Sequence, residues 1–405
     1  MGAASHLSRF AAQALDVIAS SQGRPPFTTA QRLSFLVGLC GVDVVDVAGA
    51  PLDGVVHETW TVIYRDPQTS HVNYQTACVP TYRSETPFVL QLLDGSHGRL
   101  FSRDRVASFA GIDLRTGFDV QIHARVHAPS NHYFSRVDPD LNILPTAILA
   151  SPYSACGGGC KMCARAAART FSKPSAAYIK EHVRLLRDDF AERGWETQDL
   201  WSVNLVTGCQ PTVEHELEMM LGVMGEYHHQ GFGNAKFHIY SYHLKTTSHM
   251  RALLEARAIG YIGTLETFDD TRRATLWGRD KGGQSLADHH RRYALAHELG
   301  FAIVETNYVI GTDSHETMIK GVAELDRVGV VVVPNVARSY NLAQLSSQHT
   351  DLWAMGFQYV LDGFEACVKT YRHPSIKHFA GTKAVEYLNS RGRQVSLADL
   401  PIRHT

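Results

Sequence analysis

The second half of the chain alternates between two hydrophobic patterns. Amphipathic stretches with apolar residues three and four positions apart, typical of helices, cover residues 176–194, 214–230, 248–260, 288–300 and 313–329. Short apolar runs typical of buried strands lie between and around them, at residues 144–151, 199–208, 236–244, 261–268, 302–311 and 330–336. Strands joined by helices of this length form right-handed βαβ units, so the pattern predicts a parallel sheet.

Six β/α units are two fewer than the eight that close a TIM barrel. We therefore expect an α/β fold class with a partial (β/α)6 TIM-like barrel over residues 141–340. Its active site is expected at the carboxyl ends of the strands, where barrel sites are built. At the start of the last helical stretch, Asp313 and Glu316 have the spacing of a capping box, which predicts Asp313 as the cap.

Residues 1–140 have a different pattern. Two helical stretches, 6–21 and 29–40, precede β-rich segments that are separated by Gly, Pro and Asp turn signals. This organisation predicts an N-terminal α+β accessory domain at 1–140. Residues 341–405 are expected to form a mostly helical C-terminal extension.

Charge and composition narrow the class of protein. The 39 basic and 40 acidic residues give a formal charge of −1, which supplies no electrostatic reason for a nucleic-acid or membrane partner. No apolar run approaches the roughly 18 residues of a membrane span, and the first residues lack the apolar region of a signal peptide. We expect a cytoplasmic protein with no nucleic-acid or membrane partner.

Three cysteines stand close together directly after the first predicted strand. Cys156, Cys160 and Cys163 have the spacing C-x3-C-x2-C, with three glycines between the first two. A structural zinc site usually needs four ligands, and the fourth would have to be the distant Cys209 or a histidine. A [4Fe–4S] cluster held by three thiolates instead leaves one iron open to a ligand. A reactive or incidental thiol cluster is the third reading.

This cysteine loop, placed after the first strand of a β/α series, resembles that of the radical S-adenosylmethionine (SAM) superfamily. The resemblance covers about residues 145–340 and is to single-cluster members of the biotin-synthase-like barrel type. It implies that Cys156, Cys160 and Cys163 ligate a [4Fe–4S] cluster whose open iron binds SAM. Reductive cleavage of SAM then yields a 5′-deoxyadenosyl radical that abstracts hydrogen from a substrate. A low-potential electron donor such as flavodoxin or ferredoxin is implied as a partner.

The resemblance also implies residues that bind SAM near the first two strands. Met162 takes the place of the family's aromatic residue before the third cysteine, which contacts adenine. Gly208 and Gln210 match the location of a Gly-Gly-Glu segment, although Cys209 replaces the second glycine and Gln210 the glutamate. An ordinary strand-to-helix turn, with Thr212 near the helix start, is the alternative reading.

Two later strands carry further implied SAM contacts. Glu266 is a polar residue at the end of an apolar strand, in the region that holds the SAM ribose in the family. Arg272 or Arg279 would pair with the SAM carboxylate. Val309 and Gly311 match part of a G-x-I-x-G-x-x-E pattern around adenine, in which Asn307 replaces the first glycine.

Features that the sequence lacks narrow the class of substrate. Only Cys367 follows the barrel, so the tail cannot carry a multi-cysteine auxiliary cluster. With the balanced charge, this favours a small-molecule substrate of amino-acid, sugar or nucleoside type. The reaction that follows hydrogen abstraction, whether lyase, mutase, epimerase or cyclase, stays open. The alternatives are a zinc-stabilised binding or scaffold protein and a radical SAM enzyme that modifies peptide or RNA.

Overall fold

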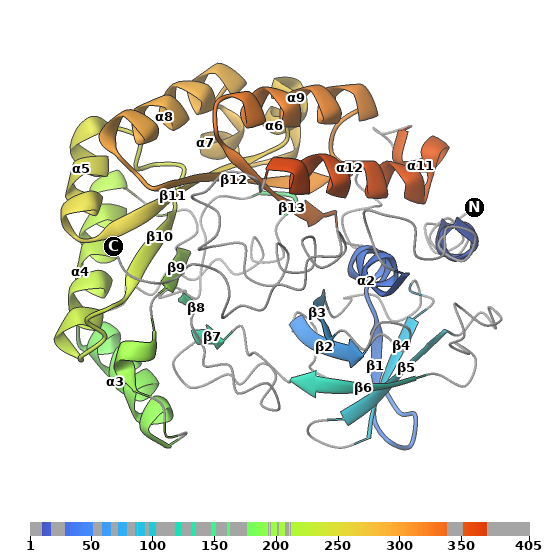
Figure 1. Ribbon diagram of the computed structural model, residues 1–405. Coiled ribbons are helices and arrows are strands. Elements are labelled where there is room, and N and C mark those ends of the chain that lie inside the picture. The colour runs from blue at the N-terminus through green and yellow to red at the C-terminus, as the bar shows by residue number, and fades with distance from the viewer. Residues whose placement is uncertain are drawn as a thin grey trace.

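The computed structural model of the chain contains two sheets and the helices that pack on them (Figure 1). The structure describes residues 10–17, 29–51, 59–65, 72–78, 86, 88–93, 97–102, 118–123, 132–134, 147–150, 160–162, 176–192, 194, 196–200, 202–206, 210, 212–337 and 351–370. All structural statements below concern these residues.

The larger sheet runs in the order β13-β12-β11-β10-β9-β8-β7. Five parallel pairings join β8 through β13 in chain order, and β7 adds to β8 antiparallel at the edge. The strands are β7 (His132–Phe134), β8 (Ala147–Ala150), β9 (Ser202–Val206), β10 (Lys236–Tyr240), β11 (Ala258–Glu266), β12 (Ile303–Ile310) and β13 (Val331–Val336). The predicted α/β class with a parallel sheet is confirmed.

Helices cover one side of this curved sheet (Figure 1). They are α3 (Ala176–Glu192), α4 (Val213–His229), α5 (Thr247–Glu255), α6 (Asp270–Leu276), α7 (Arg279–Gly282), α8 (Leu286–Leu299) and α9 (His315–Arg327). The amphipathic pattern explains the packing, since α9 buries Met318, Val322 and Leu325 on one face. Within the described residues, none of the helices combines the length and the apolar character needed to cross a bilayer.

The smaller sheet, order β1-β4-β5-β6-β2-β3, lies in the N-terminal part of the chain. Its pairings are antiparallel except for that of β1 with β4. The strands are β1 (Asp43–Val45), β2 (Thr59–Arg65), β3 (Val72–Cys78), β4 (Phe88–Leu92), β5 (His97–Ser102) and β6 (Phe118–His123). Helix α2 (Thr29–Cys40) and a helical segment at 10–17 precede it.

The C-terminal helices connect the N-terminal segment to the larger sheet. Helix α11 (Asp351–Met355) and helix α12 (Phe357–Lys369) follow β13, and α12 packs on β13 and α9. The rings of Phe35 in α2 and Phe364 in α12 stack, with centroids 3.7 Å apart. Phe10 meets Trp353 edge to face at 5.7 Å. One hydrophobic core therefore runs from the first helices to the last.

The start of α9 differs from the predicted cap. Ser314, not Asp313, is the N-cap, and its hydroxyl accepts the backbone N–H of Thr317 at 3.2 Å. The Asp313 carboxylate is fully buried and accepts three hydrogen bonds of 2.6 to 3.0 Å from residues 267–269, which follow β11. The capping-box prediction for Asp313 was wrong because these donors from another strand end engage its side chain.

Candidate functional site

One cysteine of the predicted trio is placed in detail, beside the junction of α6 and α7, which follow β11. The thiol of Cys160 is buried and accepts a hydrogen bond from the backbone N–H of Gly278 at 3.4 Å. The N–H of Lys161 donates to the carbonyl of Leu276 at 3.0 Å. Leu276 and Gly278 lie at the junction between α6 and α7. One contact to the Cys160 sulfur and one between backbones therefore hold residues 160–161 against the α6–α7 junction.

The surroundings of Cys160 suit a ligand to an iron–sulfur cluster. Its thiol is not in a disulfide, and a backbone N–H directed at the sulfur stabilises the negative charge of a thiolate ligand. The other two members, Cys156 and Cys163, lie outside the described residues. Met162 is buried beside Cys160, and its adenine contact stays a prediction.

A strained glutamate and a lysine form an ion pair at the same end of the sheet. Glu266 is the last residue of β11 and has a φ of 68°, which is uncommon for a residue with a side chain. Its carboxylate accepts a 2.5 Å hydrogen bond from the ammonium of Lys281 in α7, and both side chains are about one-seventh exposed. Such backbone conformations occur disproportionately at functional sites. The expected polar partner of Glu266 is thus found within the chain, and its SAM contact stays a prediction.

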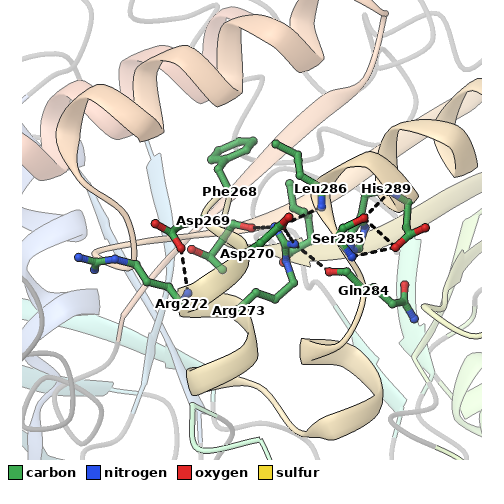
Figure 2. Close-up of polar contacts among 12 residues, drawn as sticks. Phe268, Asp269, Asp270, Arg272, Arg273, Gln284, Ser285, Leu286 and His289 are labelled. Atoms are coloured by element: carbon green, nitrogen blue, oxygen red, sulfur yellow. Dashed lines mark hydrogen bonds and ion pairs between the residues drawn. The ribbon is translucent and has the colours of Figure 1, made fainter.

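Arg272 connects two strand ends. Its guanidinium donates to the backbone carbonyl of Thr312, after β12, at 2.9 Å. Its backbone N–H donates to the carboxylate of Asp269 at 2.9 Å (Figure 2). The neighbouring Arg273 is fully buried and donates to the carbonyl of Gln284 at 2.8 Å. Arg272 therefore lies near the carboxyl ends of β11 and β12, and its pairing with a SAM carboxylate stays a prediction.

The turn after β9 is placed in part. Gln210 is buried just before α4, whereas Gly208 lies outside the described residues. Thr212 is the N-cap of α4, and its hydroxyl accepts the N–H of His215 at 3.1 Å. The strand-to-helix reading is therefore confirmed for Thr212. The SAM contacts of Gly208 and Gln210 stay predictions.

Backbone geometry at the end of β12 explains why residue 311 is a glycine. Gly311 has a φ of 109°, a conformation that side chains rarely adopt, and it begins the turn into α9. Val309, two residues earlier, is half-buried. The turn closes with a 3.3 Å hydrogen bond from the N–H of Thr312 to the carbonyl of Val309. The predicted adenine contacts of Val309 and Gly311 are not tested by this geometry.

A carboxylate–histidine pair at the end of β10 was not predicted. Glu216 in α4 is fully buried and accepts a 2.5 Å hydrogen bond from the hydroxyl of Ser241. Its second oxygen lies 2.9 Å from Nδ1 of His243. Because a carboxylate only accepts, Nδ1 of His243 is the donor in this contact. Glu216 and His243 are 27 positions apart and gave no sequence signal, since the contact depends on how α4 packs against β10.

Neither a protein-family model nor a curated protein sequence matches the chain. Several solved structures resemble it distantly. HydG, a maturase of the [FeFe]-hydrogenase, has 13% identity and a TM-score of 0.41 over 58% of this chain and 56% of its own. Methylornithine synthase (PylB) has 15% identity and a TM-score of 0.38 over 54% of this chain and 62% of its own. The Escherichia coli coproporphyrinogen III oxidase HemN, a radical SAM enzyme, has 10% identity and a TM-score of 0.35 over 55% and 51%. The matched region thus spans between half and two thirds of each of these structures.

Proposed function

We propose that this protein is a radical SAM enzyme that acts on a small molecule. The observation that carries the proposal is the contact of Cys160 and Lys161 with the α6–α7 junction, beside the α7 helix whose Lys281 pairs with Glu266 at the end of β11. In the proposal, Cys156, Cys160 and Cys163 hold a [4Fe–4S] cluster. When bound, that cluster supplies the electron that cleaves SAM to a hydrogen-abstracting 5′-deoxyadenosyl radical.

The chain's own groups have separable roles in this proposal. The N–H of Gly278 orients the Cys160 sulfur and stabilises its charge. Lys281 holds Glu266 in place, and together they offer SAM one cationic and one anionic group. Glu216 orients the imidazole of His243 through its contact with Nδ1. The further proposed SAM contacts are Met162, Gly208, Gln210, Arg272, Val309 and Gly311.

The proposal extends to partners. A flavodoxin or ferredoxin would deliver the electron, and the substrate would be a biosynthetic small molecule of amino-acid, sugar or nucleoside type. The balanced charge of the chain supports this class over nucleic acid.

Anaerobic reconstitution tests the proposal. The purified chain is treated with iron and sulfide, reduced, and mixed with SAM, and both bound iron and 5′-deoxyadenosine are quantified. We expect product from the wild type and at least a hundredfold loss in Cys160→Ala. Cys367→Ala is the matched control, because Cys367 is equally buried but lies in α12, and it should keep both cluster and product.

Two results would contradict the proposal. One is stoichiometric zinc with no 5′-deoxyadenosine from the wild type. The other is a Cys160→Ala variant that makes product as fast as the wild type.

A further inference from the structure

The two faces of the larger sheet differ in chemistry. The face against the helices carries apolar side chains, and the ring of Phe237 in β10 lies 5.7 Å from that of Tyr227 in α4. On the same face, a Cβ added to Gly263 in β11 would overlap the ring of Tyr293 in α8. Because side chains alternate along a strand, the residues between these positions belong to the opposite face. We call this opposite face the inner face.

Polar residues lie in register on the inner face, beside apolar ones such as Ile262 and Val331. Asn204 in β9 pairs with His238 in β10, whose imidazole lies over Gly260 of β11. One layer further along the strands, Tyr240 and Glu305 flank Ile262 in a single row. A closed barrel fills such positions with branched apolar side chains that form a packed core. The buried polar groups on this face instead suit a ligand.

Glu305 in β12 is the buried carboxylate of the inner face. It is fully buried, and neither carboxylate oxygen has a hydrogen-bond donor within the described part of the chain. Burying a carboxylate without donors is costly, and burial raises the pKa of Glu305 well above its ordinary value. The two other fully buried carboxylates described above, Asp313 and Glu216, are by contrast paired through both oxygens.

A ligand that stabilises the ionised form of Glu305 brings N–H donors and a positive charge, because a carboxylate only accepts. A divalent metal would require several oxygen, nitrogen or sulfur ligands together. In the part of the chain that the structure describes, no three His, Cys, Asp or Glu residues gather in that way. A single carboxylate suits a protonated amine instead. Tyr240 and the amide oxygen of Asn204, which has no hydrogen-bond partner among the described residues, are polar groups on the same face.

We propose that the inner face binds the substrate and that Glu305 recognises a protonated amine on it. This assignment of substrate class rests on the proposed function, since it places the substrate on the sheet whose carboxyl end carries the cysteine loop. Glu305 forms the ion pair with the ammonium group, and Asn204 and Tyr240 contact the neighbouring polar atoms of the molecule.

Binding of simple amines tests the proposal directly. The full chain with its reconstituted cluster is titrated with n-butylamine, n-butanol and butyrate, which have similar length and differ in the terminal group. By ligand-observed NMR we expect n-butylamine to bind the wild type and its Kd to rise at least tenfold in Glu305→Gln. Glu298→Gln removes the same charge from an exposed position of α8 and should leave the Kd unchanged. Butanol and butyrate should bind wild type and Glu305→Gln alike.

Infrared difference spectra report the protonation state of Glu305, which would not change on adding amine if the residue had only a structural role. In the wild type, adding n-butylamine should remove the carbonyl stretch of a protonated carboxyl group, and Glu305→Gln should lack this change. Equal Kd values for wild type and Glu305→Gln would overturn the proposal. So would the absence of that carbonyl stretch before amine is added, because another group of the chain would then already pair with Glu305.

The 5′-deoxyadenosine assay separates this proposal from the one on which it rests. Product formation without Glu305-dependent amine binding leaves the radical SAM proposal intact and overturns the amine site. Amine binding that depends on Glu305 in a chain that forms no 5′-deoxyadenosine does the reverse: it supports the amine site and contradicts the enzyme class.

Discussion

The carboxyl edge of the larger sheet and its inner face both bury carboxylates, in opposite circumstances. At the edge, Asp313 accepts three hydrogen bonds from the segment after β11, and Glu216 accepts from Ser241 and pairs with His243. On the inner face, Glu305 receives no hydrogen bond from any described residue. All three side chains are fully buried, so burial alone does not explain the difference.

The comparison separates carboxylates that hold the fold from one that is available to a ligand. The donors at the edge come from loops and helix starts, so Asp313 and Glu216 join elements that are distant in sequence. Glu305 lies in mid-strand, where the backbone N–H groups beside it are used in the β-ladder. A carboxylate there finds no backbone donor, and its counter-charge must come from a side chain or a ligand.

Removing the carboxylate of Asp313 should have the largest effect on stability. Asp313→Ala leaves one hydroxyl and two backbone N–H groups without an acceptor, at about 1–3 kcal/mol for each buried donor. We expect the free energy of unfolding to fall by about 4 kcal/mol, measured by urea denaturation. Glu298→Ala, at an exposed site, is the control and should stay within about 0.5 kcal/mol of the wild type. If Asp313→Ala lowered the free energy of unfolding as little as the control does, the hydrogen bonds of Asp313 would not hold the fold.

Glu305→Gln should raise the free energy of unfolding rather than lower it, and the size of this effect should depend on pH. Burial raises the pKa of Glu305 in the folded state above its ordinary value near 4.5, so above that pH the folded chain keeps a proton that the unfolded chain releases. Wild-type stability should therefore fall by about 1.4 kcal/mol per pH unit as pH rises, until the folded pKa is reached. Glu305→Gln lacks this slope.

Urea midpoints of wild type and Glu305→Gln at pH 5, 6 and 7 measure the effect. The free energy of unfolding of the wild type should fall relative to that of Glu305→Gln between pH 5 and pH 7, because burial raises the pKa of Glu305 in the folded state. Saturating n-butylamine should reduce this difference, because the ammonium group stabilises the ionised carboxylate. If the urea midpoints of the two proteins changed with pH in parallel, Glu305 would already be paired within the chain. It would then be a structural carboxylate like Asp313 and Glu216.

Much of the larger sheet was predictable because its periodicity is local. The six apolar runs correspond to β8–β13, and the amphipathic stretches correspond to α3, α4, α5, α8 and α9. Shorter elements escaped prediction, among them β1 and the α6–α7 pair, since three to seven residues give too few turns of a pattern to recognise. The cap of α9 was wrong because a long-range contact engaged Asp313.

The site was predictable only where the signal lies within a few residues. The spacing of Cys156, Cys160 and Cys163 is such a signal, and the position of Cys160 after the first strand placed it at the carboxyl edge. Its contact with Gly278 spans 118 residues and has no trace in the sequence. Glu305 was visible as a charge within an apolar run, but which face it occupies and whether it has a donor depend on strand register, which the sequence leaves open.

The two faces of β11 allow the smallest and most discriminating test. A Cβ at Gly263 would overlap the ring of Tyr293 on the helix-covered face, whereas a Cβ at Gly260 would overlap the imidazole of His238 on the inner face. Gly263→Ala should reduce the free energy of unfolding by about 2 kcal/mol through overpacking and leave the Kd for n-butylamine unchanged. Gly260→Ala should cost about 1 kcal/mol but weaken amine binding severalfold, because the displaced imidazole enters the space beside Tyr240. Urea denaturation and the NMR titration measure both quantities for each variant. If Gly263→Ala weakened amine binding as much as Gly260→Ala, the inner face would have no separate role, and both glycines would act through the stability of the strand alone.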